Sequence, residues 1–237
     1  KSTTADECIY EKECVWHHLL LAVQADPMKQ EITGNLNVRK WEEPIRFKVM
    51  AKTKGINGER INGWYQSMAR FTTQKISVEN VENFLILFTE DIEEELKGPY
   101  RKTFKSVFGD DRILGHYKKV IKKRGDKCYY VLLQDPKLNN AIYSYFAFIQ
   151  KDHPDIQSCI KEAIYTGFGL SSIANSPIFK DYDTDGPYTK LELLLLLVLS
   201  QDGVRSGMSH DELKLIFHQI YEPLIQKTKE IEIFNDY

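Results

Sequence analysis

Four short segments in the first two thirds of the chain have the side-chain pattern of β-strands. In residues 45–50, apolar side chains alternate with Arg46 and Lys48, which is the period of a half-buried strand, and Pro44 precedes them as a strand entry. The other three segments are short runs of aliphatic, aromatic and β-branched residues. The expected strands are residues 45–50, 84–88, 129–134 and 142–150. We therefore predict a sheet of about four strands.

The last third of the chain has helical periodicity instead. Asp155 is placed to cap a helix that runs to about Gly167. Thr189 and Glu192 form a capping-box pattern at the start of a leucine-rich helix, and a further amphipathic helix follows. Strands followed by helices favour an α+β fold with a small mixed sheet of about four strands and a helical C-terminal third.

Two more helices are expected in the N-terminal half. Residues 11–24 carry apolar side chains at helical spacing and should pack against the main body. A second helix is expected over residues 64–75, after a turn at Asn62 and Gly63. No repeat, low-complexity tract or linker divides the chain. We therefore predict an N-terminal helical segment over residues 1–30, followed by one domain over residues 31–237.

The overall composition is that of an ordinary globular protein. The 237 residues include 32 basic and 34 acidic side chains, and the formal net charge is −2. Bulk charge therefore gives no argument for binding to nucleic acid. The longest apolar run, residues 193–199, is far shorter than the ~20 residues that cross a bilayer. We predict no transmembrane segment and interpret this run as a core helix.

Positive charge is nevertheless concentrated in one part of the chain. Residues 100–127 contain ten basic side chains against three aspartates. One interpretation is a solvated helical face. The other is a contact surface for an anionic polymer, aided by Tyr100, Phe104, Phe108 and Tyr117, whose binding would depend steeply on salt.

The cysteines bear on the compartment in which the protein works. No two of them form a Cys-x-x-Cys pair. We predict two disulfides, Cys8–Cys14 and Cys128–Cys159, while the alternative is four reduced thiols in a cytosolic protein. The chain starts with Lys1 rather than Met, for which a removed signal segment is one explanation. Two disulfides would indicate a secreted or periplasmic protein.

Familiar enzyme signatures are absent from the sequence. No two of the six histidines have the i, i+4 spacing that places two imidazoles on one helix face around zinc. Phosphate-binding glycine loops and dinucleotide fingerprints are also absent, so we expect no nucleotide cofactor. His210 and His218 flank the last predicted helix, and a solvent-facing or hydrogen-bonded role is the simpler interpretation for both.

Residues 181–192 match the pattern of an EF-hand calcium loop, with a glycine at the sharp turn. Calcium takes oxygen ligands, and alternate residues of such a loop converge on one point. The alternative is that the last glutamate only completes a capping box and that the aspartates form Asx-turns. Bound calcium would connect the loop to the leucine-rich helix and stabilise it rather than take part in catalysis. The candidate ligands are Asp181, Asp183, Asp185, the carbonyl of Pro187, and Glu192.

Residues 159–170, Cys-Ile-Lys-Glu-Ala-Ile-Tyr-Thr-Gly-Phe-Gly-Leu, resemble a bacterial family of secreted and envelope proteins of unknown function. Its members have roughly Cys-x-x-Glu-Glu-x-x-Gln-x-Leu-Gly-Leu on a helix. Residues 40–45 are similar to the family's Trp-x-x-Pro strand entry, and residues 176–181 and 200–208 to its later loops. The resemblance extends over about residues 32–221. This family in turn resembles zinc metallopeptidases of the His-Glu-x-x-His-x-x-Gly-x-x-His type.

The resemblance implies a zincin-like architecture, a sheet above a long helix, without the zinc site. Zinc-activated water needs three firm ligands and a carboxylate base, and this chain has neither at the matching positions, so no zinc is expected. The resemblance also implies secretion and a disulfide between Cys128 and Cys159. The positions that match the peptidases' first histidine, general base, second histidine and third histidine are Glu162, Ala163, Thr166 and Ser172.

Three alternative functions follow, of which the first two belong to different classes. The first is a secreted or periplasmic envelope-associated pseudo-peptidase that acts as a binding or structural module, stabilised by calcium, with an envelope protein or an anionic polymer as partner. The second is a hydrolase with a rebuilt active site around Glu162, with Asp181 or His210 as partners. A third is an intracellular protein whose basic segment binds an anionic ligand. A metal assay separates the first two functions.

Overall fold

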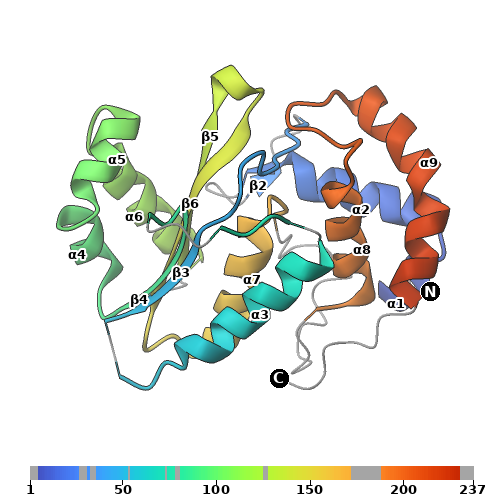
Figure 1. The fold of residues 1–237 in the computed structure, drawn as a ribbon. Helices are drawn as coiled ribbons and strands as arrows, with labels where there is room; N and C mark the ends of the chain where they lie inside the picture. Colours follow the sequence, from blue (N-terminus) through green and yellow to red (C-terminus); the bar gives the residue numbers. More distant parts are fainter. Residues whose placement is uncertain are drawn as a thin grey trace.

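The computed structural model describes residues 5–26, 31–32, 36–52, 54–72, 74–77, 81–124, 128–171 and 188–229. Within them the chain forms an α+β fold whose C-terminal part is helical, as the sequence predicts (Figure 1). The N-terminal elements are α1 (Ala5–Cys8), α2 (Lys12–Gln24) and a two-stranded sheet of β1 (Ala25–Asp26) and β2 (Glu31–Ile32). The remaining elements are β3 (Phe47–Ala51), α3 (Gly58–Phe71), β4 (Phe84–Thr89), α4 (Ile92–Lys97), α5 (Arg101–Phe108), α6 (Arg112–Arg124), β5 (Cys128–Asp135), η1 (Pro136–Leu138), β6 (Ala141–Gln150), α7 (Ile156–Gly167), α8 (Lys190–Ser200) and α9 (His210–Lys229).

The main sheet has four strands in the order β3-β4-β6-β5. Strands β3, β4 and β6 are parallel, and the edge strand β5 runs antiparallel to β6. All four strands fall within two residues of the predicted segments, so the prediction of a small mixed sheet is confirmed. The parallel pairs need crossover connections, which α3 supplies between β3 and β4.

The sheet is covered by helices on both faces (Figure 1). Side chains alternate between the faces, so that Phe84 and Ile86 of β4 lie in one core and Leu85 and Leu87 in the other. The first core, with α3, α7 and α8, is the larger one. The second core lies under α4, α5 and α6. The fold is therefore thicker than a sheet packed on one long helix.

Helix α8 is the central helix of the larger core. All residues from Leu191 to Leu199 are buried, which is typical of a helix that packs on every side. The N-terminal helices α1 and α2 pack on it, and α9 packs on it as well. The prediction that the leucine-rich run is a core helix is confirmed. None of the helices in the described parts of the chain is long and apolar enough to cross a membrane.

One local prediction is wrong. The helix expected over residues 64–75 after a turn at Asn62 and Gly63 begins at Gly58 and ends at Phe71. Asn57 is the N-cap, and its side-chain oxygen accepts the backbone N–H of Arg60 at 3.0 Å. Ile61 lies in the core, and its burial favours a helix that begins almost two turns earlier than the Asn-Gly pair suggests.

The aromatic side chains of residues 100–117 do not form a surface. Phe104 is fully buried, Tyr117 is 8% exposed, and Tyr100 and Phe108 pack against the same second core. The basic side chains of this segment are exposed, but Arg101 is paired with Asp111 at 2.8 Å, and other basic residues are similarly paired. These contacts correct the expectation that the aromatic residues aid contact with an anionic polymer.

Candidate functional site

Helix α7 carries the residues that the resemblance singles out. Asp155 caps it, and the Asp155 carboxylate accepts the backbone N–H of Ser158 at 3.0 Å. The Glu162 side chain is half-buried and accepts a hydrogen bond from the Tyr130 hydroxyl at 3.2 Å. The same hydroxyl lies 3.1 Å from the backbone oxygen of Cys159. Glu162 is thus held against the edge strand β5.

The inward face of α7 is filled by the protein itself. Ala163 is fully buried and Thr166 is 3% exposed. Gly167, on the same helix, lies so close to Phe84 and Tyr145 that a Cβ atom would overlap both rings. Ser172, the remaining position, lies outside the described residues. Three of the four positions that match the zinc site are therefore in or beside packed core.

A buried ion pair joins α7 to the start of α8. The Lys161 ammonium lies 3.6 Å from the Glu192 carboxylate, and the two side chains are 13% and 1% exposed. Lys161 also lies over the ring of Tyr188, 5.3 Å from its centroid, and the Tyr188 hydroxyl donates to the Lys161 backbone oxygen at 3.1 Å. Burial lowers the pKa of Lys161, and the Glu192 carboxylate opposes this shift.

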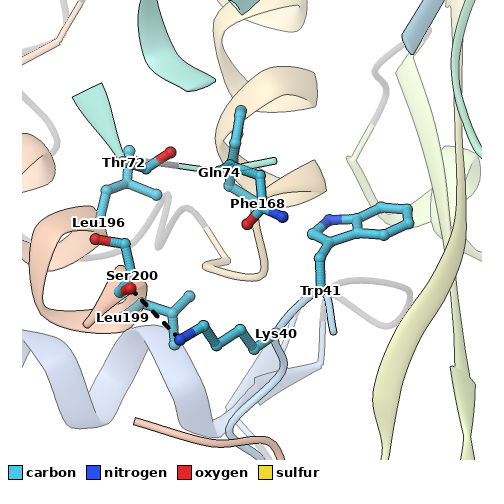
Figure 2. Close-up of a pocket in the computed structure, with 8 residues that line it drawn as sticks. All are labelled: Lys40, Trp41, Thr72, Gln74, Phe168, Leu196, Leu199 and Ser200. Carbon is cyan, nitrogen blue, oxygen red and sulfur yellow. Dashed lines mark hydrogen bonds between the residues drawn. The ribbon is translucent and has the colours of Figure 1, made fainter. Parts of the chain in front are cut away.

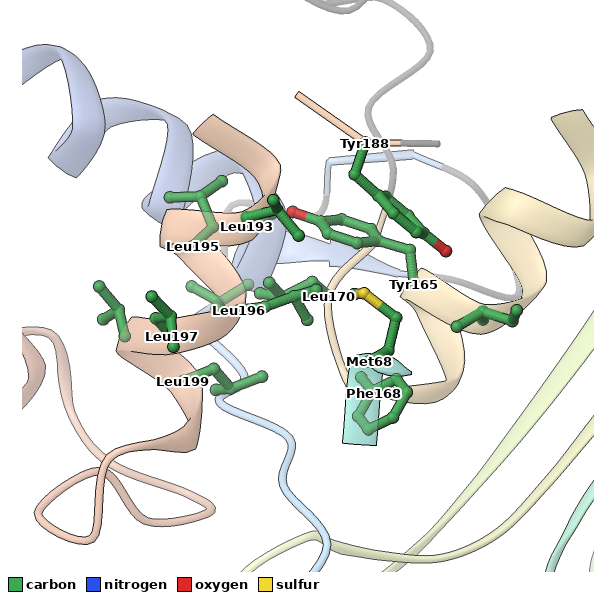
Figure 3. Close-up of a cluster of buried hydrophobic side chains, with 14 of the residues drawn as sticks. Met68, Tyr165, Phe168, Leu170, Tyr188, Leu193, Leu195, Leu196, Leu197 and Leu199 are labelled. Atoms are coloured by element: carbon green, nitrogen blue, oxygen red, sulfur yellow. The ribbon is translucent and has the colours of Figure 1, made fainter. Parts of the chain in front are cut away.

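Two tyrosines in this region carry buried hydroxyls without a hydrogen-bond partner among the described residues, Tyr145 of β6 and Tyr165 of α7. Burial raises the pKa of both well above the ordinary value, with smaller contributions from Glu162 at Tyr145 and from Glu192 at Tyr165. Figure 3 shows Tyr165 beside Tyr188, facing the leucines of α8. A buried hydroxyl without a partner costs roughly 1–3 kcal/mol, so each of these two groups lowers the stability of the fold by about that amount.

The predicted calcium loop lies mostly outside the described residues. Asp181, Asp183, Asp185 and Pro187 belong to that part. Glu192 completes a capping box: its carboxylate accepts the backbone N–H of Thr189 at 2.6 Å, and its own N–H donates to the Thr189 hydroxyl at 3.2 Å. The capping interpretation is therefore confirmed for Glu192. Calcium binding stays a prediction, and an ion would share this carboxylate with Lys161.

The four cysteines lie in the predicted pairs. Cys8 is joined to Cys14 and Cys128 to Cys159, with Cα atoms 5.4 and 6.1 Å apart, separations that a disulfide permits. The second pair connects β5 to α7, next to Glu162. Oxidation of the four cysteines in the isolated protein stays a prediction.

His210 is not placed as a partner of Glu162. It lies at the start of α9, where its Nδ1 is 3.1 Å from Asp211 and its ring packs on Trp16 of α2 at 5.3 Å. The simpler interpretation of this histidine, a partly exposed and hydrogen-bonded side chain, agrees with these contacts.

The ammonium group of Lys40 closes the C-terminal end of α8. It donates to the backbone oxygens of Ser200, Gln201 and Val204 at 3.4, 2.8 and 3.0 Å. Helix C-termini carry partial negative charge, so a cation stabilises them. Burial nevertheless lowers the pKa of Lys40.

The two neighbours of Lys40 act on other helix ends. The Arg39 guanidinium is 2% exposed and donates to the backbone oxygens of Ala22, near the end of α2, and of Gly169, just after α7, both at 3.3 Å. The Trp41 indole donates to the backbone oxygen of Gly167 at 2.7 Å. Three consecutive side chains thus fix the C-terminal ends of three helices.

A small pocket lies beside Lys40 and Trp41, where the C-terminal ends of α3, α7 and α8 meet (Figure 2). Its free volume is about 10 Å³, close to the lower limit of about 10–15 Å³ for one ordered water. This space is too small for a substrate, so the pocket is not a candidate active site. It is lined by Lys40, Trp41, Thr72, Gln74, Phe168, Leu196, Leu199 and Ser200.

Sequence reasoning identified Glu162 and Glu192 but missed their partners. Lys161, Tyr130 and Tyr145 carry no motif, and only the three-dimensional packing brings them to the two carboxylates. One available signal was the alternation of β5 and β6, which places Tyr130 and Tyr145 on the face toward α7.

Residues 21–219 match the family described as "Protein of unknown function (DUF2927)". The match extends over more than half of the chain, so the protein belongs to this family. A search of curated proteins and a search of solved structures found no match.

Proposed function

We propose that the protein is a secreted or periplasmic binding or structural module of the cell envelope, built on a peptidase-like scaffold that does not use zinc catalysis. The observation that carries this proposal is the packing of α7. Ala163 and Thr166 are buried at two positions where the resembled peptidases have catalytic groups. Neither side chain offers a ligand that zinc prefers, and the space around them is filled.

The partner of such a module is an envelope protein or an anionic polymer. The exposed lysines of α5 and α6, Lys102, Lys105, Lys119 and Lys122, support the second choice. A steep decrease of polymer binding with salt is the expected behaviour, because phosphate or carboxylate partners release counterions.

The alternative function is a hydrolase with an active site around Glu162. The half-buried Glu162 carboxylate accepts a hydrogen bond from the Tyr130 hydroxyl, and this pair favours the alternative. The buried Tyr145 hydroxyl has no hydrogen-bond partner among the described residues, and after burial the Glu162 charge is the next cause that raises its pKa. A carboxylate with a phenol at its side supplies a general base and a hydrogen-bond donor.

Zinc titration and a hydrolysis assay with a general protein substrate distinguish the two functions. Both are run on the oxidised full chain, on Glu162→Gln, and on Glu222→Gln, which changes an exposed glutamate of α9. We expect no zinc-dependent rise of the unfolding midpoint and no hydrolysis above buffer in any of the three. Zinc stabilisation or hydrolysis that is lost only in Glu162→Gln would refute the proposal in favour of the hydrolase.

We also propose that calcium stabilises the loop of residues 181–192. A ligand that binds only the folded chain at 100 times its Kd stabilises it by about 2.7 kcal/mol. Calcium should therefore raise the unfolding midpoint of the wild type and of Asp202→Asn, an exposed control outside the loop, but not of Asp183→Asn. An equal midpoint in calcium and in chelator would exclude the site.

A further inference from the structure

A cluster of metal-ligating side chains lies at the N-terminal end of the chain. Cys8 ends α1, while Cys14 and His18 lie four residues apart on α2 and so share one helix face. One ligand atom from each of the three residues lies within 4.8 Å of the other two. Cys8 is fully buried, His18 is 5% exposed, and Cys14 is half-buried.

Two sulfurs and an imidazole are a donor set that zinc prefers, but the sulfurs bind metal only as thiolates. In the structure they are joined as a disulfide, so the donor set exists only after reduction. We propose that Cys8, Cys14 and His18 are a redox-gated zinc site: a disulfide when oxidised and a three-ligand zinc centre when reduced.

The exchange needs a dithiol as reductant. One thiolate of the dithiol attacks the sulfur of Cys14, the half-buried member, and the sulfur of Cys8 leaves as a thiolate. The second thiol of the reductant then closes its own disulfide and releases Cys14. Two electrons pass from the dithiol to the cysteine pair. The two protons of the dithiol pass to solvent, and zinc binds the two cysteine thiolates and the neutral imidazole of His18.

Solvent supplies the fourth ligand of the tetrahedral centre. Among the described residues the cluster offers three ligands, which leaves one position open, as in zinc sites that hold a water molecule. Cys14 is the least buried of the three residues, so solvent reaches the cluster from its side.

The other cysteine pair is a comparison within the same chain. Cys128 and Cys159 also lie within ligand distance of a histidine, His153, but the two cysteines are 0% and 4% exposed. The Nδ1 atom of His153 accepts the backbone N–H of Asp155 at 2.9 Å. Burial protects this pair from a dithiol, so the proposal applies to the first cluster alone.

The first cluster lies before residue 21, where the match to the family begins. The site would therefore be an addition to the family domain. It does not depend on the proposed function, which is tested on the oxidised chain.

The experiment measures zinc bound to the full chain after gel filtration, before and after treatment with a phosphine reductant, which replaces the dithiol because it competes less for metal. We expect no bound zinc in the oxidised protein and one tightly bound equivalent after reduction. His18→Ala should weaken the affinity at least about tenfold, since even the loss of an outer-shell partner costs about 10–100-fold. His17→Ala, which changes the exposed neighbour, should bind as the wild type does.

Cobalt substitution reports the ligands directly. The reduced wild type should show a thiolate-to-cobalt charge-transfer band and tetrahedral ligand-field bands, both lost in the Cys8→Ser, Cys14→Ser double variant. Circular dichroism shows whether each variant is folded. Absence of tight zinc binding by the folded, reduced wild type would overturn the proposal. Equal zinc affinity of reduced His18→Ala and reduced His17→Ala would also overturn the proposal. This holds even if His18→Ala is unfolded, because zinc binding would then not depend on the folded cluster.

Discussion

Replacement of Gly167 by alanine should destabilise the protein although alanine is the better helix former. A Cβ atom at this position would overlap the ring of Phe84 and lie 2.9 Å from a ring carbon of Tyr145. The Phe84 ring is fully buried and packed between neighbours, with ring centroids 5.4 Å from Tyr65 and 6.1 Å from Trp41. It therefore has no space into which it can move, and α7 would have to shift from the sheet.

The magnitude follows from two opposing effects. Alanine in place of glycine gains about 0.5–1 kcal/mol within a helix, while overpacking of a well-packed core costs about 1–3 kcal/mol or more. We expect a net loss of roughly 1–2 kcal/mol in the free energy of unfolding. For a chain of this length the unfolding midpoint should fall by about 2–4 °C per kcal/mol.

Gly63→Ala is the matched control, because Gly63 lies inside α3 and a Cβ added there would meet no atom of another segment within 4 Å. This variant should gain about 0.5–1 kcal/mol. Urea unfolding followed by circular dichroism measures both changes at constant m-value. If Gly167→Ala were as stable as the wild type, the inward face of α7 would have free space, and the argument for a filled site would fail.

Three further predictions concern other contacts. Lys40→Met removes the cation that caps the end of α8 and should lower the free energy of unfolding in urea by about 2 kcal/mol. The side chain of Lys48 is 48% exposed, so the control Lys48→Met should lower it by less than about 0.5 kcal/mol. Equal effects of the two variants would refute the capping role. The denatured chain should show no reactive thiol before reduction and four after it, and four reactive thiols beforehand would refute the disulfides. Burial raises the pKa of Tyr117 to about 12, so its contribution to stability is complete below pH 10 and lost as the pH rises through 12. In an alkaline titration, part of the rise in tyrosinate absorbance should therefore coincide with the loss of the circular dichroism signal, because the buried tyrosine ionises as the chain unfolds. Complete ionisation of all tyrosines near pH 10 in a chain that is still folded would contradict this prediction.

The sequence was sufficient for elements whose cause is local. The alternation in residues 45–50 predicted β3, and the Thr189 and Glu192 pair predicted the start of α8, because a strand period and a capping box each depend on a few neighbouring residues. The start of α3 was predicted wrongly, since burial of Ile61 in the core outweighs the turn preference of an Asn-Gly pair.

The partners at the candidate site depend on contacts between distant segments. Lys161 and Glu192 meet only because α7 and α8 pack together, and Lys40 meets Gln201 across 161 positions of the chain. Neither pair has a periodicity or a spacing that a sequence pattern records. Arg39 is a further example, because arginine is usually exposed in proteins but Arg39 is only 2% exposed here.

The close packing of α7 links the fold to the proposed function. A helix that carries a catalytic metal must leave room beside its ligands for water and substrate, because the metal needs an open coordination position. Here a glycine brings α7 into contact with Phe84 and Tyr145, and this contact fills the inner face of the helix, while its two charged side chains, Lys161 and Glu162, lie on the rim. Under the proposed function, we therefore expect the recognition surface of α7 to lie at this rim, where Tyr130 and Glu192 hold Glu162 and Lys161.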